Sequence, residues 1–308
     1  MKVCFIGFGS IAKRHIKNIK ELYRESMQID LFRSKRGEQD GNSAGEMIHA
    51  VYYDRDRLPC DYDVIFITNP TRLHYNTLEA FHSHGRHFFI EKPVFETGRE
   101  DIKHLGLRPE SVYYVACPLR YTNVIQYLKK HVDFSEIYSV RCISSSYLPD
   151  WRPGTDYRDS YSAKRELGGG VSIDLIHEWD YLCYLLGEPE RVKSMIAKKS
   201  DLEIDSDDIA VYVAEYRDKL VELHLDYFGR VPVRKMELFG REEVIEADLI
   251  QERVWYRKSG RTIELAEERD AYQKREMEYF FKLLGQAAAN PNPIGRACRT
   301  LQIAGGEW

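Results

Sequence analysis

Val3-Cys-Phe-Ile-Gly-Phe-Gly-Ser-Ile-Ala12, close to the start of the chain, is the stretch that decides the fold. Its first four residues are all apolar, which is typical of a strand buried on both faces of a parallel sheet. Gly7, Gly9 and Ala12 then give the pattern G-x-G-x-x-A. Its first position permits a tight turn, its second lets the backbone approach a pyrophosphate, and its third lets a helix pack closely on the strand. The stretch therefore predicts a strand–turn–helix unit that binds a dinucleotide.

The helix predicted after this turn, from Ile11 to about Leu22, directs its N-terminal amides and its dipole toward the phosphates. We therefore expect Gly7, Gly9, Ser10 and Ile11 to contact the cofactor. A lone G-x-G-x-x-A also occurs at ordinary strand–helix turns, so that structural alternative stays open. The buried strand before the motif and the amphipathic helix after it favour cofactor binding.

The composition is that of an ordinary globular protein, with 308 residues, 43% hydrophobic and 31% charged, and a formal net charge of −4. This charge gives no reason to expect a nucleic-acid partner, and no stretch approaches the ~20 apolar residues of a membrane span. The N-terminus lacks the regions of a signal peptide. The six cysteines are scattered, with no C-x-x-C pair, which indicates reduced thiols. We therefore expect a cytoplasmic protein with no membrane partner.

The first part of the chain alternates predicted strands and helices. The strands are expected at residues 3–6, 28–32, 51–53, 63–68, 87–90 and 112–116. The helices are expected at residues 11–24, 43–50, 73–84 and 97–105. This order predicts an α/β domain with a Rossmann-type doubly wound parallel sheet, spanning residues 1–119.

Residues 120–308 have a different character and predict a second, α+β domain. Helices are expected at 123–130, 171–186 and 271–289. A strand at 137–146, a polar aromatic loop at 147–167 and six strands between 192 and 256 complete the pattern. A run of strands of this kind predicts an open, mainly antiparallel sheet. We expect this domain to bind the substrate and to form oligomer contacts.

The residues after the second predicted strand bear on which dinucleotide binds. An NAD-preferring site usually has Asp or Glu at this point to accept a hydrogen bond from the ribose 2′-hydroxyl. Here the strand is followed by Arg33-Ser34-Lys35-Arg36, and Asp30 lies two residues too early. The basic run favours NADP(H) over NAD(H), with Arg33 and Ser34 as contacts of the 2′-phosphate. A solvated run of charges is the structural alternative.

Two loops follow the next buried strands, Thr68-Asn-Pro-Thr-Arg-Leu-His74 and Glu91-Lys-Pro93. Ligands of a doubly wound sheet bind at the carboxyl ends of its strands. The expected cofactor contacts in these loops are Thr68, Asn69, Pro70, His74, Glu91 and Lys92. A lysine at the end of a buried strand is costly unless its ammonium has a function or a partner, although it could also emerge into water. Pro93 is a candidate for a cis peptide bond.

A third motif, Gly168-Gly-Gly-Val-Ser-Ile-Asp174-Leu-Ile-His177-Glu-Trp-Asp180, lies in the second domain. Asp174, His177 and Asp180 are three residues apart and therefore share one face of the predicted helix. The glycines would let the backbone approach the nicotinamide or the substrate closely. We expect no metal here, because the rest of the chain offers no further ligand cluster. A purely structural histidine stays open.

Taken together, G-x-G-x-I-A, T-x-P-x-x-x-H, E-K-P and a glycine triplet with D-x-x-H resemble the Gfo/Idh/MocA oxidoreductase family, over nearly the whole chain. The resemblance implies hydride transfer between NAD(P) and a secondary hydroxyl or ketone of a sugar, nucleotide sugar or cyclitol. It implies that Lys92 lies beside the nicotinamide and the reacting hydroxyl. It also implies that Arg120 lies beside the active site, as a contact of cofactor and substrate, and that the protein is a homodimer or homotetramer.

Lys92, Asp174 and His177 are the candidate catalytic residues. An imidazole, with an ordinary pKa of about 6.5, can take a hydroxyl proton at neutral pH. Asp174 would orient His177 or bind a substrate hydroxyl, and the Lys92 ammonium would stabilise alkoxide charge or share the proton relay. Family members often separate the aspartate and the histidine by four residues, whereas this chain separates them by three.

The loop at 147–167 offers aromatic faces for a sugar ring and arginines for a carboxylate or phosphate. The expected substrate contacts are Lys92, Arg120, Trp151, Arg152, Tyr157, Arg158, Asp174 and His177. A loop that contacts another subunit is the structural alternative. Two further functions stay open: an enzyme that retains NAD(P) and uses transient oxidation for epimerisation or glycoside cleavage, and a non-catalytic dinucleotide or sugar sensor.

Overall fold

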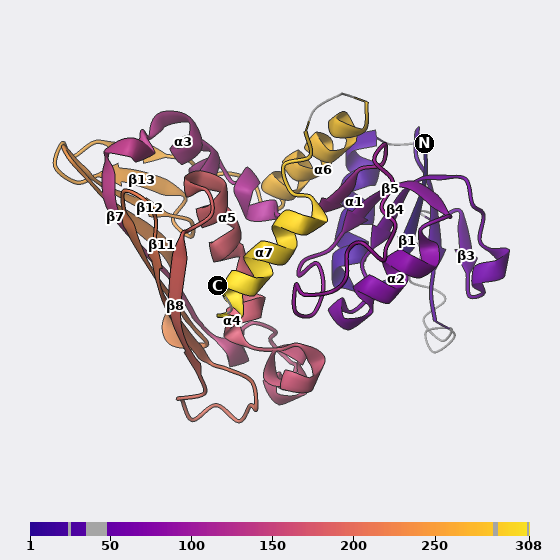
Figure 1. Cartoon of the computed structure of the whole chain (residues 1–308), viewed down its shortest axis with the longest axis horizontal. Helices are drawn as coiled ribbons and strands as arrows, with labels where there is room; N and C mark the ends of the chain where they lie inside the picture. Colours follow the sequence, from indigo (N-terminus) through magenta and orange to yellow (C-terminus); the bar gives the residue numbers. More distant parts are fainter. Residues whose placement is uncertain (24–25, 35–47, 286–288, 307) are drawn as a thin grey trace. The chain divides into compact units, whose positions relative to one another are not determined.

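The computed structural model describes residues 1–23, 26–34, 48–285, 289–306 and 308, and they form two compact units (Figure 1). The first unit consists of residues 1–116 and 273–298, and the second of residues 117–272 and 299–308. The sequence predicts one boundary, after residue 119. In the structure the chain passes from one unit to the other three times, because residues 273–298 pack with the N-terminal unit.

A six-stranded parallel sheet, in the order β3-β2-β1-β4-β5-β6, forms the centre of the first unit. Its strands are β1 Lys2–Ile6, β2 Gln28–Phe32, β3 Ala50–Tyr52, β4 Tyr62–Ile67, β5 Gly85–Ile90 and β6 Tyr113–Val115. The strand order reverses between β1 and β4, where doubly wound sheets bind their ligands. This arrangement confirms the predicted Rossmann fold.

Helices cover both faces of this sheet. Phe66 on β4 contacts Phe280 of α6 (Ala271–Leu284) and His15 of α1 (Ser10–Tyr23), so these helices cover one face. Phe81 of α2 (His74–Phe81) packs edge-on against Phe32, which points to the opposite face. The strands are therefore buried on both sides, which explains their continuous apolar runs.

One predicted helix of the first unit is wrong, and a second lies largely outside the described residues. Residues 97–105 form turns, because the Glu100 carboxylate accepts hydrogen bonds from the backbone of Glu96 and Thr97 and from the Thr97 hydroxyl. Side-chain bonds of this kind compete with the helical ladder. Most of the helix predicted at 43–50 falls in the range 35–47, which the structure does not describe.

An eight-stranded sheet, in the order β14-β13-β12-β11-β7-β10-β9-β8, dominates the second unit. Its strands are β7 Ile137–Tyr147, β8 Arg191–Ala197, β9 Ile209–Glu215, β10 Leu220–Asp226, β11 Phe228–Gly240, β12 Val244–Asp248, β13 Arg253–Tyr256 and β14 Thr262–Glu264. β7 and β10 pair in parallel, and the other neighbours pair antiparallel. The prediction of a mainly antiparallel sheet is confirmed.

The helices of the second unit are α3 Asn123–His131, α4 Val171–Asp174, α5 Ile176–Leu186 and the last part of α7 Ile294–Ala304. The single helix predicted at 171–186 is divided at Leu175, whose φ of −92° and ψ of 29° lie outside the helical region. α5 buries Trp179 completely against Tyr212 of β9. Across the described ranges, no helix has both the length and the apolar character needed to cross a membrane.

Candidate active site

The glycine turn after β1 has one face against the protein and one open face. Gly7 has a φ of +98°, and a Cβ placed on it would lie 2.8 Å from the backbone nitrogen of Asn69. The Thr68 hydroxyl holds this approach by donating to the carbonyl oxygens of Ile6 (3.0 Å) and Gly7 (3.2 Å). A Cβ on Gly9 would meet nothing within 4 Å. The missing side chain of Gly7 therefore allows the close approach of Asn69, and that of Gly9 leaves space for a ligand.

The residues at this turn fit a dinucleotide. α1 begins at Ser10, and the amides of its first turn have no partner within the helix. Gly9 and Ser10 are exposed, and Ile11 is half-buried beside them. Free amides, the positive end of the helix dipole and an open glycine surface form the cradle that a pyrophosphate requires.

Two cations, Arg33 directly after β2 and Lys13 on α1, lie against one aromatic ring. The guanidinium carbon of Arg33 lies 5.3 Å from the ring centroid of Phe8, and Nζ of Lys13 lies 5.1 Å from the same centroid. Asp30 is only 1% exposed and accepts a hydrogen bond from the Tyr62 hydroxyl at 2.7 Å. Asp30 is therefore committed to the core. Lys13 was missed by sequence reasoning, although its position on the first turn of α1 provided a signal.

Ser34 is exposed beside Arg33, whereas Lys35 and Arg36 of the predicted basic run lie outside the described residues. Pro70 precedes a short 3₁₀ turn, η5 (Thr71–Leu73), at the start of α2.

His74 links the two loops at the carboxyl ends of β4 and β5. Its Nε2 lies 2.8 Å from the carbonyl oxygen of Asn69, and its Nδ1 lies 3.0 Å from that of Pro93 and 3.2 Å from that of Val94. Burial lowers the pKa of His74, against the opposing effect of these carbonyls and of Glu91. The structure therefore gives His74 a clamping role between the loops.

Asn69, a predicted cofactor contact, keeps part of its side chain without a protein partner. Its Nδ2 donates to the Thr77 hydroxyl at 2.8 Å. Its Oδ1 is buried and has no hydrogen-bond partner among the residues that the structure describes. Because an unmade bond of a buried polar atom is costly, this acceptor is suited to a ligand or water at the turn.

Glu91 of the E-K-P motif is held inside the first unit. Its Oε1 lies 2.5 Å from Nε2 of His15 on α1, and its Oε2 accepts the backbone N–H of Lys92 at 3.2 Å. Burial alone would raise the pKa of Glu91, but the hydrogen bond from His15 and the charges of His15 and Lys92 hold it below its ordinary value. The peptide bond between Lys92 and Pro93 is cis, as predicted. Lys92 is half-buried at the carboxyl end of β5.

Asp174 of the second unit pairs with a tyrosine that sequence reasoning missed. The Tyr227 hydroxyl donates to Oδ2 of Asp174 at 2.5 Å, and both residues are buried. Burial and the charge of Asp174 raise the pKa of Tyr227 well above its ordinary value. The Trp151 ring contacts Tyr227 edge-on, with centroids 5.2 Å apart. The three side chains connect the loop after β7, the end of β10 and α4.

The helix face that the sequence predicts for Asp174, His177 and Asp180 is divided between α4 and α5. Asp180 receives a bidentate ion pair from Arg120, with Nε 2.8 Å from Oδ2 and Nη2 2.6 Å from Oδ1, and both residues are buried. Asp174 lies on α4, whereas His177 is half-buried at the start of α5. In the described part of the chain, no group of three His, Cys, Asp or Glu residues could hold a metal ion.

Two glycines of the triplet, Gly169 and Gly170, pack against the protein itself, whereas Gly168 faces open space. A Cβ on Gly169 would lie 2.1 Å from the carbonyl oxygen of Tyr161, and a Cβ on Gly170 would lie 2.2 Å from Oδ1 of Asp207. Asp207 in turn accepts the Ser172 N–H at 2.9 Å at the start of α4. These two glycines are therefore needed for intramolecular packing.

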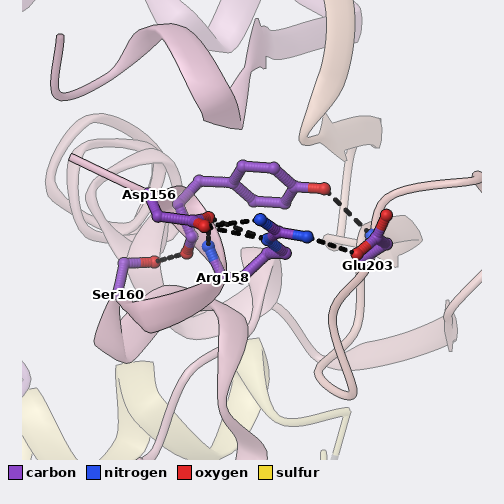
Figure 2. A network of polar contacts seen from close by, with 5 residues as sticks. Asp156, Arg158, Ser160 and Glu203 are labelled. Carbon is purple, nitrogen blue, oxygen red and sulfur yellow. Dashed lines mark hydrogen bonds and ion pairs between the residues drawn. The ribbon is translucent and has the colours of Figure 1, made fainter. Parts of the chain in front are cut away.

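The predicted substrate loop is ordered by four short 3₁₀ turns and by an ion network around Arg158 (Figure 2). The turns are η8 Leu148–Asp150, η9 Tyr157–Asp159, η10 Tyr161–Ala163 and η11 Arg165–Leu167. Arg158 donates to both carboxylate oxygens of Asp156 and, through Nη1, to Oε2 of Glu203 at 2.8 Å. Its hydrogen bonds lower the pKa of Asp156 to about 2. The Tyr157 hydroxyl accepts the Glu203 N–H at 3.1 Å. Arg158 and Tyr157 therefore hold the loop.

A small pocket with room for about one water molecule lies in this loop beside Trp151. It is lined by Leu148, Pro149, Trp151, Arg152, Thr155, Tyr157, Ser160 and Ser162. The Trp151 side chain is 36% exposed, and its Nε1 donates to the Ser146 hydroxyl at 2.9 Å. An anchored aromatic ring with hydroxyls and a guanidinium around it has the chemistry of a sugar-binding surface.

Comparison with known proteins gives matches over both units. The model described as "Oxidoreductase family, NAD-binding Rossmann fold" matches residues 1–107. The model described as "GFO/IDH/MocA C-terminal domain" matches residues 125–246. Together they cover more than half of the chain.

Two relatives illustrate the similarity in sequence. A D-xylose dehydrogenase of Paenarthrobacter nicotinovorans is 30% identical over 141 residues, 44% of this chain and 36% of that protein. A UDP-N-acetylglucosamine 3-dehydrogenase of Acidithiobacillus ferrooxidans is 23% identical over 255 residues, 81% of this chain and 74% of that protein. The chain spans only 36% and 52% of the length of the first two curated relatives that it matches.

Solved structures show the same fold across the whole chain. The A. ferrooxidans enzyme has a TM-score of 0.80 at 20% identity, covering 100% of this chain and 96% of that one. A levoglucosan dehydrogenase, also solved with NADH and levoglucosan, has a TM-score of 0.82 in its apo form at 17% identity, covering 99% and 95%. The family models confirm the resemblance carried by the motifs, and the chain belongs to the GFO/IDH/MocA oxidoreductase family.

Proposed function

We propose that this protein is an NAD(P)-dependent oxidoreductase that moves a hydride between the nicotinamide and a secondary hydroxyl or ketone of a sugar, nucleotide sugar or cyclitol. The observation that carries this proposal is the open cradle of Gly9 and the first turn of α1, beside the strand end that holds Lys92. The similarity to dehydrogenases of D-xylose and UDP-N-acetylglucosamine supports the substrate class.

The catalytic roles proposed for Lys92 and His177 follow from the chemistry of their side chains and from the resemblance to the GFO/IDH/MocA family. A bound nicotinamide supplies the hydride acceptor or donor. In the oxidising direction, a ring nitrogen of His177 takes the hydroxyl proton, and the Lys92 ammonium stabilises the developing alkoxide. Asp174, fixed by Tyr227, holds His177 or a substrate hydroxyl in place. Replacing Lys92 by Met removes the ammonium, so we expect kcat to fall roughly 100-fold or more in steady-state assays.

NADP(H) is the cofactor that the described residues favour. Arg33 and Lys13 both lie against the Phe8 ring, so two cations flank the point where a 2′-phosphate would enter. Asp30, the nearest carboxylate in the strand, is bonded to Tyr62 and unavailable to a ribose hydroxyl. A guanidinium and an ammonium together suit a phosphate better than a neutral hydroxyl.

The sugar is proposed to lie against the outer surface of this loop, with its apolar face on Trp151 and hydroxyls toward Arg152, because both side chains are exposed. Arg158 is bound by two carboxylates and contributes order to the loop. Of the basic residues predicted in this loop, Arg152 is therefore the better substrate contact.

The first experiment is titration of the purified protein with NADPH and with NADH, followed by nicotinamide fluorescence. Exchangeable NADPH bound at least 10-fold more tightly than NADH supports the proposal, and R33Q should abolish that difference. A screen of sugars, sugar nucleotides and inositols then identifies the substrate. Cofactor that survives purification would indicate an internal-redox epimerase or glycosidase. Absence of binding to either cofactor would contradict the enzyme function and leave the sensor.

The second unit is proposed to form the contacts of a homodimer or homotetramer. One face of its sheet exposes apolar side chains at two alternate positions of β9, Val211 and Val213, and at Met195 of β8, which is 80% exposed. Neighbouring apolar positions of this kind on a sheet face are typical of an interaction surface.

A further inference from the structure

Arg234 on β11 is an arginine that is anchored at one end and open at the other. Its Nε donates to Oε1 of Glu178 at 2.7 Å, and Glu178 is completely buried. The Arg234 side chain keeps 27% of its exposure. Among the described residues, Nη1 and Nη2 have no hydrogen-bond partner, and neither belongs to the buried polar atoms that lack one. Both nitrogens therefore reach accessible space.

This arrangement prepares a guanidinium for an anion. One of its five N–H groups is used by Glu178, which fixes the plane of the group. The remaining fork of Nη1 and Nη2 matches the two oxygens of a carboxylate or phosphate. Arg234 differs in this respect from Arg120 and Arg158, the arginines that the sequence predicts as substrate contacts. The forks of Arg120 and Arg158 are bound by Asp180 and by Asp156 with Glu203.

Arg234 lies on the same part of the second unit as Asp174 and His177, the two catalytic candidates of that unit. Glu178 follows His177 directly on α5. Arg234 pairs with Ser144 of β7, which pairs with Leu225 of β10. Tyr227, two residues farther along, points to the same face, and strand geometry puts the two Cα atoms about 12 Å apart. The fork and the Asp174–Tyr227 pair therefore belong to one end of one sheet face.

We infer that Arg234 recognises an acidic group of the substrate, binding two oxygens of a sugar carboxylate or of a sugar phosphate through Nη1 and Nη2. This inference rests on the proposed function, and it narrows the substrate from sugars in general to acidic or phosphorylated sugars. Glu178 acts as the positioning residue, because its carboxylate holds Nε and leaves the fork free.

Arginine footprinting tests the inference without turnover and without cofactor. The protein is treated with phenylglyoxal, and modification of Arg234 is followed by mass spectrometry in the presence of D-glucuronate, D-galacturonate, D-glucose 6-phosphate or neutral D-glucose. We expect at least one of the acids to slow the modification of Arg234 about 5-fold or more, and glucose to have no effect. Protection by a uronate assigns the carboxylate, and protection by glucose 6-phosphate assigns the phosphate. Equal rates with all four sugars would overturn the inference.

Calorimetry with R234K provides the second arm, because lysine keeps the charge and loses the fork. The protecting acid should bind R234K roughly 10- to 100-fold more weakly, with NADPH affinity unchanged. Arg141→Lys is the matched control, since Arg141 is exposed and paired with Glu222 on the opposite face of the sheet. Equal affinity of R234K and wild type would also overturn the inference. Protection of Arg234 without redox activity on any sugar would leave the anion site standing and remove the proposed function. Turnover of neutral sugars without protection of Arg234 would support the proposed function and overturn the anion site.

Discussion

Tyr227 determines the environment in which Asp174 works. The carboxylate is buried, and a neutral phenol donates to it at 2.5 Å from the end of β10. A buried carboxylate without such a donor has a large desolvation cost. Tyr227 is thus a positioning residue for one of the catalytic candidates, at a separation of 53 residues that no local motif reveals.

Tyr227→Phe removes this one hydroxyl and keeps the ring that packs against Trp151. We expect the free energy of unfolding to fall by about 1–3 kcal/mol, because Asp174 loses a buried donor. We also expect kcat to fall more than KM rises, since Asp174 is left to reorient. Urea denaturation and steady-state kinetics check the two effects. Tyr138→Phe, at an exposed position, is the control. Unchanged stability and kcat in Tyr227→Phe would contradict this role.

At the scale of elements, loops are joined by single buried side chains. His74, at the start of α2, reaches carbonyls of the loops after β4 and β5, and His15 of α1 reaches Glu91. These contacts fix the loop that carries Lys92 relative to the glycine turn within the first unit. The geometry of the cofactor cradle therefore depends on two histidines that need not contact the cofactor.

The buried His74 predicts a pH dependence of stability. Since burial lowers its pKa, the unfolded chain binds a proton at a higher pH than the folded protein does. The corresponding stability is fully present above the ordinary pKa of about 6.5 and is lost as the pH falls toward the lower folded value. We expect H74N to lose less stability than wild type between pH 7.5 and pH 5 in urea denaturation. H104N, at an exposed histidine, should behave like wild type. Identical slopes for H74N and wild type would refute the assignment.

The glycine triplet gives a second prediction for an element. Gly169→Ala forces a Cβ against the carbonyl oxygen of Tyr161, so the loop or α4 must move. Overpacking of this kind costs about 1–3 kcal/mol or more. Gly168→Ala is the matched control, because its φ of +82° causes strain of about 1 kcal/mol but its Cβ would point into open space. Equal urea midpoints for the two variants would contradict the packing role of Gly169.

The sequence predicts those features that a local pattern encodes. The apolar run Val3–Ile6 with Gly7 and Gly9 sufficed for β1 and the turn, and alternation sufficed for most strands of the second sheet. Helix 97–105 failed because the Glu100 carboxylate bonds nearby backbone, a competition that apolar periodicity does not register. The contacts of His15, Tyr227 and Asp207 join segments that are far apart in the sequence, so no local sequence pattern predicts them. Arg120 and Arg158 looked available because their acidic partners could not be assigned from the sequence.

For the whole molecule, the exposed face of β8 and β9 predicts self-association. Val213→Arg replaces an exposed apolar side chain of this face, between Lys193 and Glu222 on the neighbouring strands, by a charged one and leaves the opposite, buried face untouched. We expect the variant to sediment as a smaller species than wild type at equal concentration, with unchanged circular dichroism. Analytical ultracentrifugation measures this. Lys193→Arg, on the neighbouring strand, is a control that keeps the charge. A monomeric wild type would remove the proposed interface.

Because the first unit includes residues 273–298, it cannot be completed until most of the chain has been synthesised. Phe280, from a segment made late, packs on Phe66 and on Phe89 of the first unit. During synthesis, that aromatic face lacks Phe280 until residue 280 has left the ribosome, which happens only after all of residues 117–272 have emerged. A fragment that stops at residue 119 would expose the same face permanently. The domain that is first in the sequence is therefore not the first to finish, and chaperones that bind aromatic surfaces have the longest access to it.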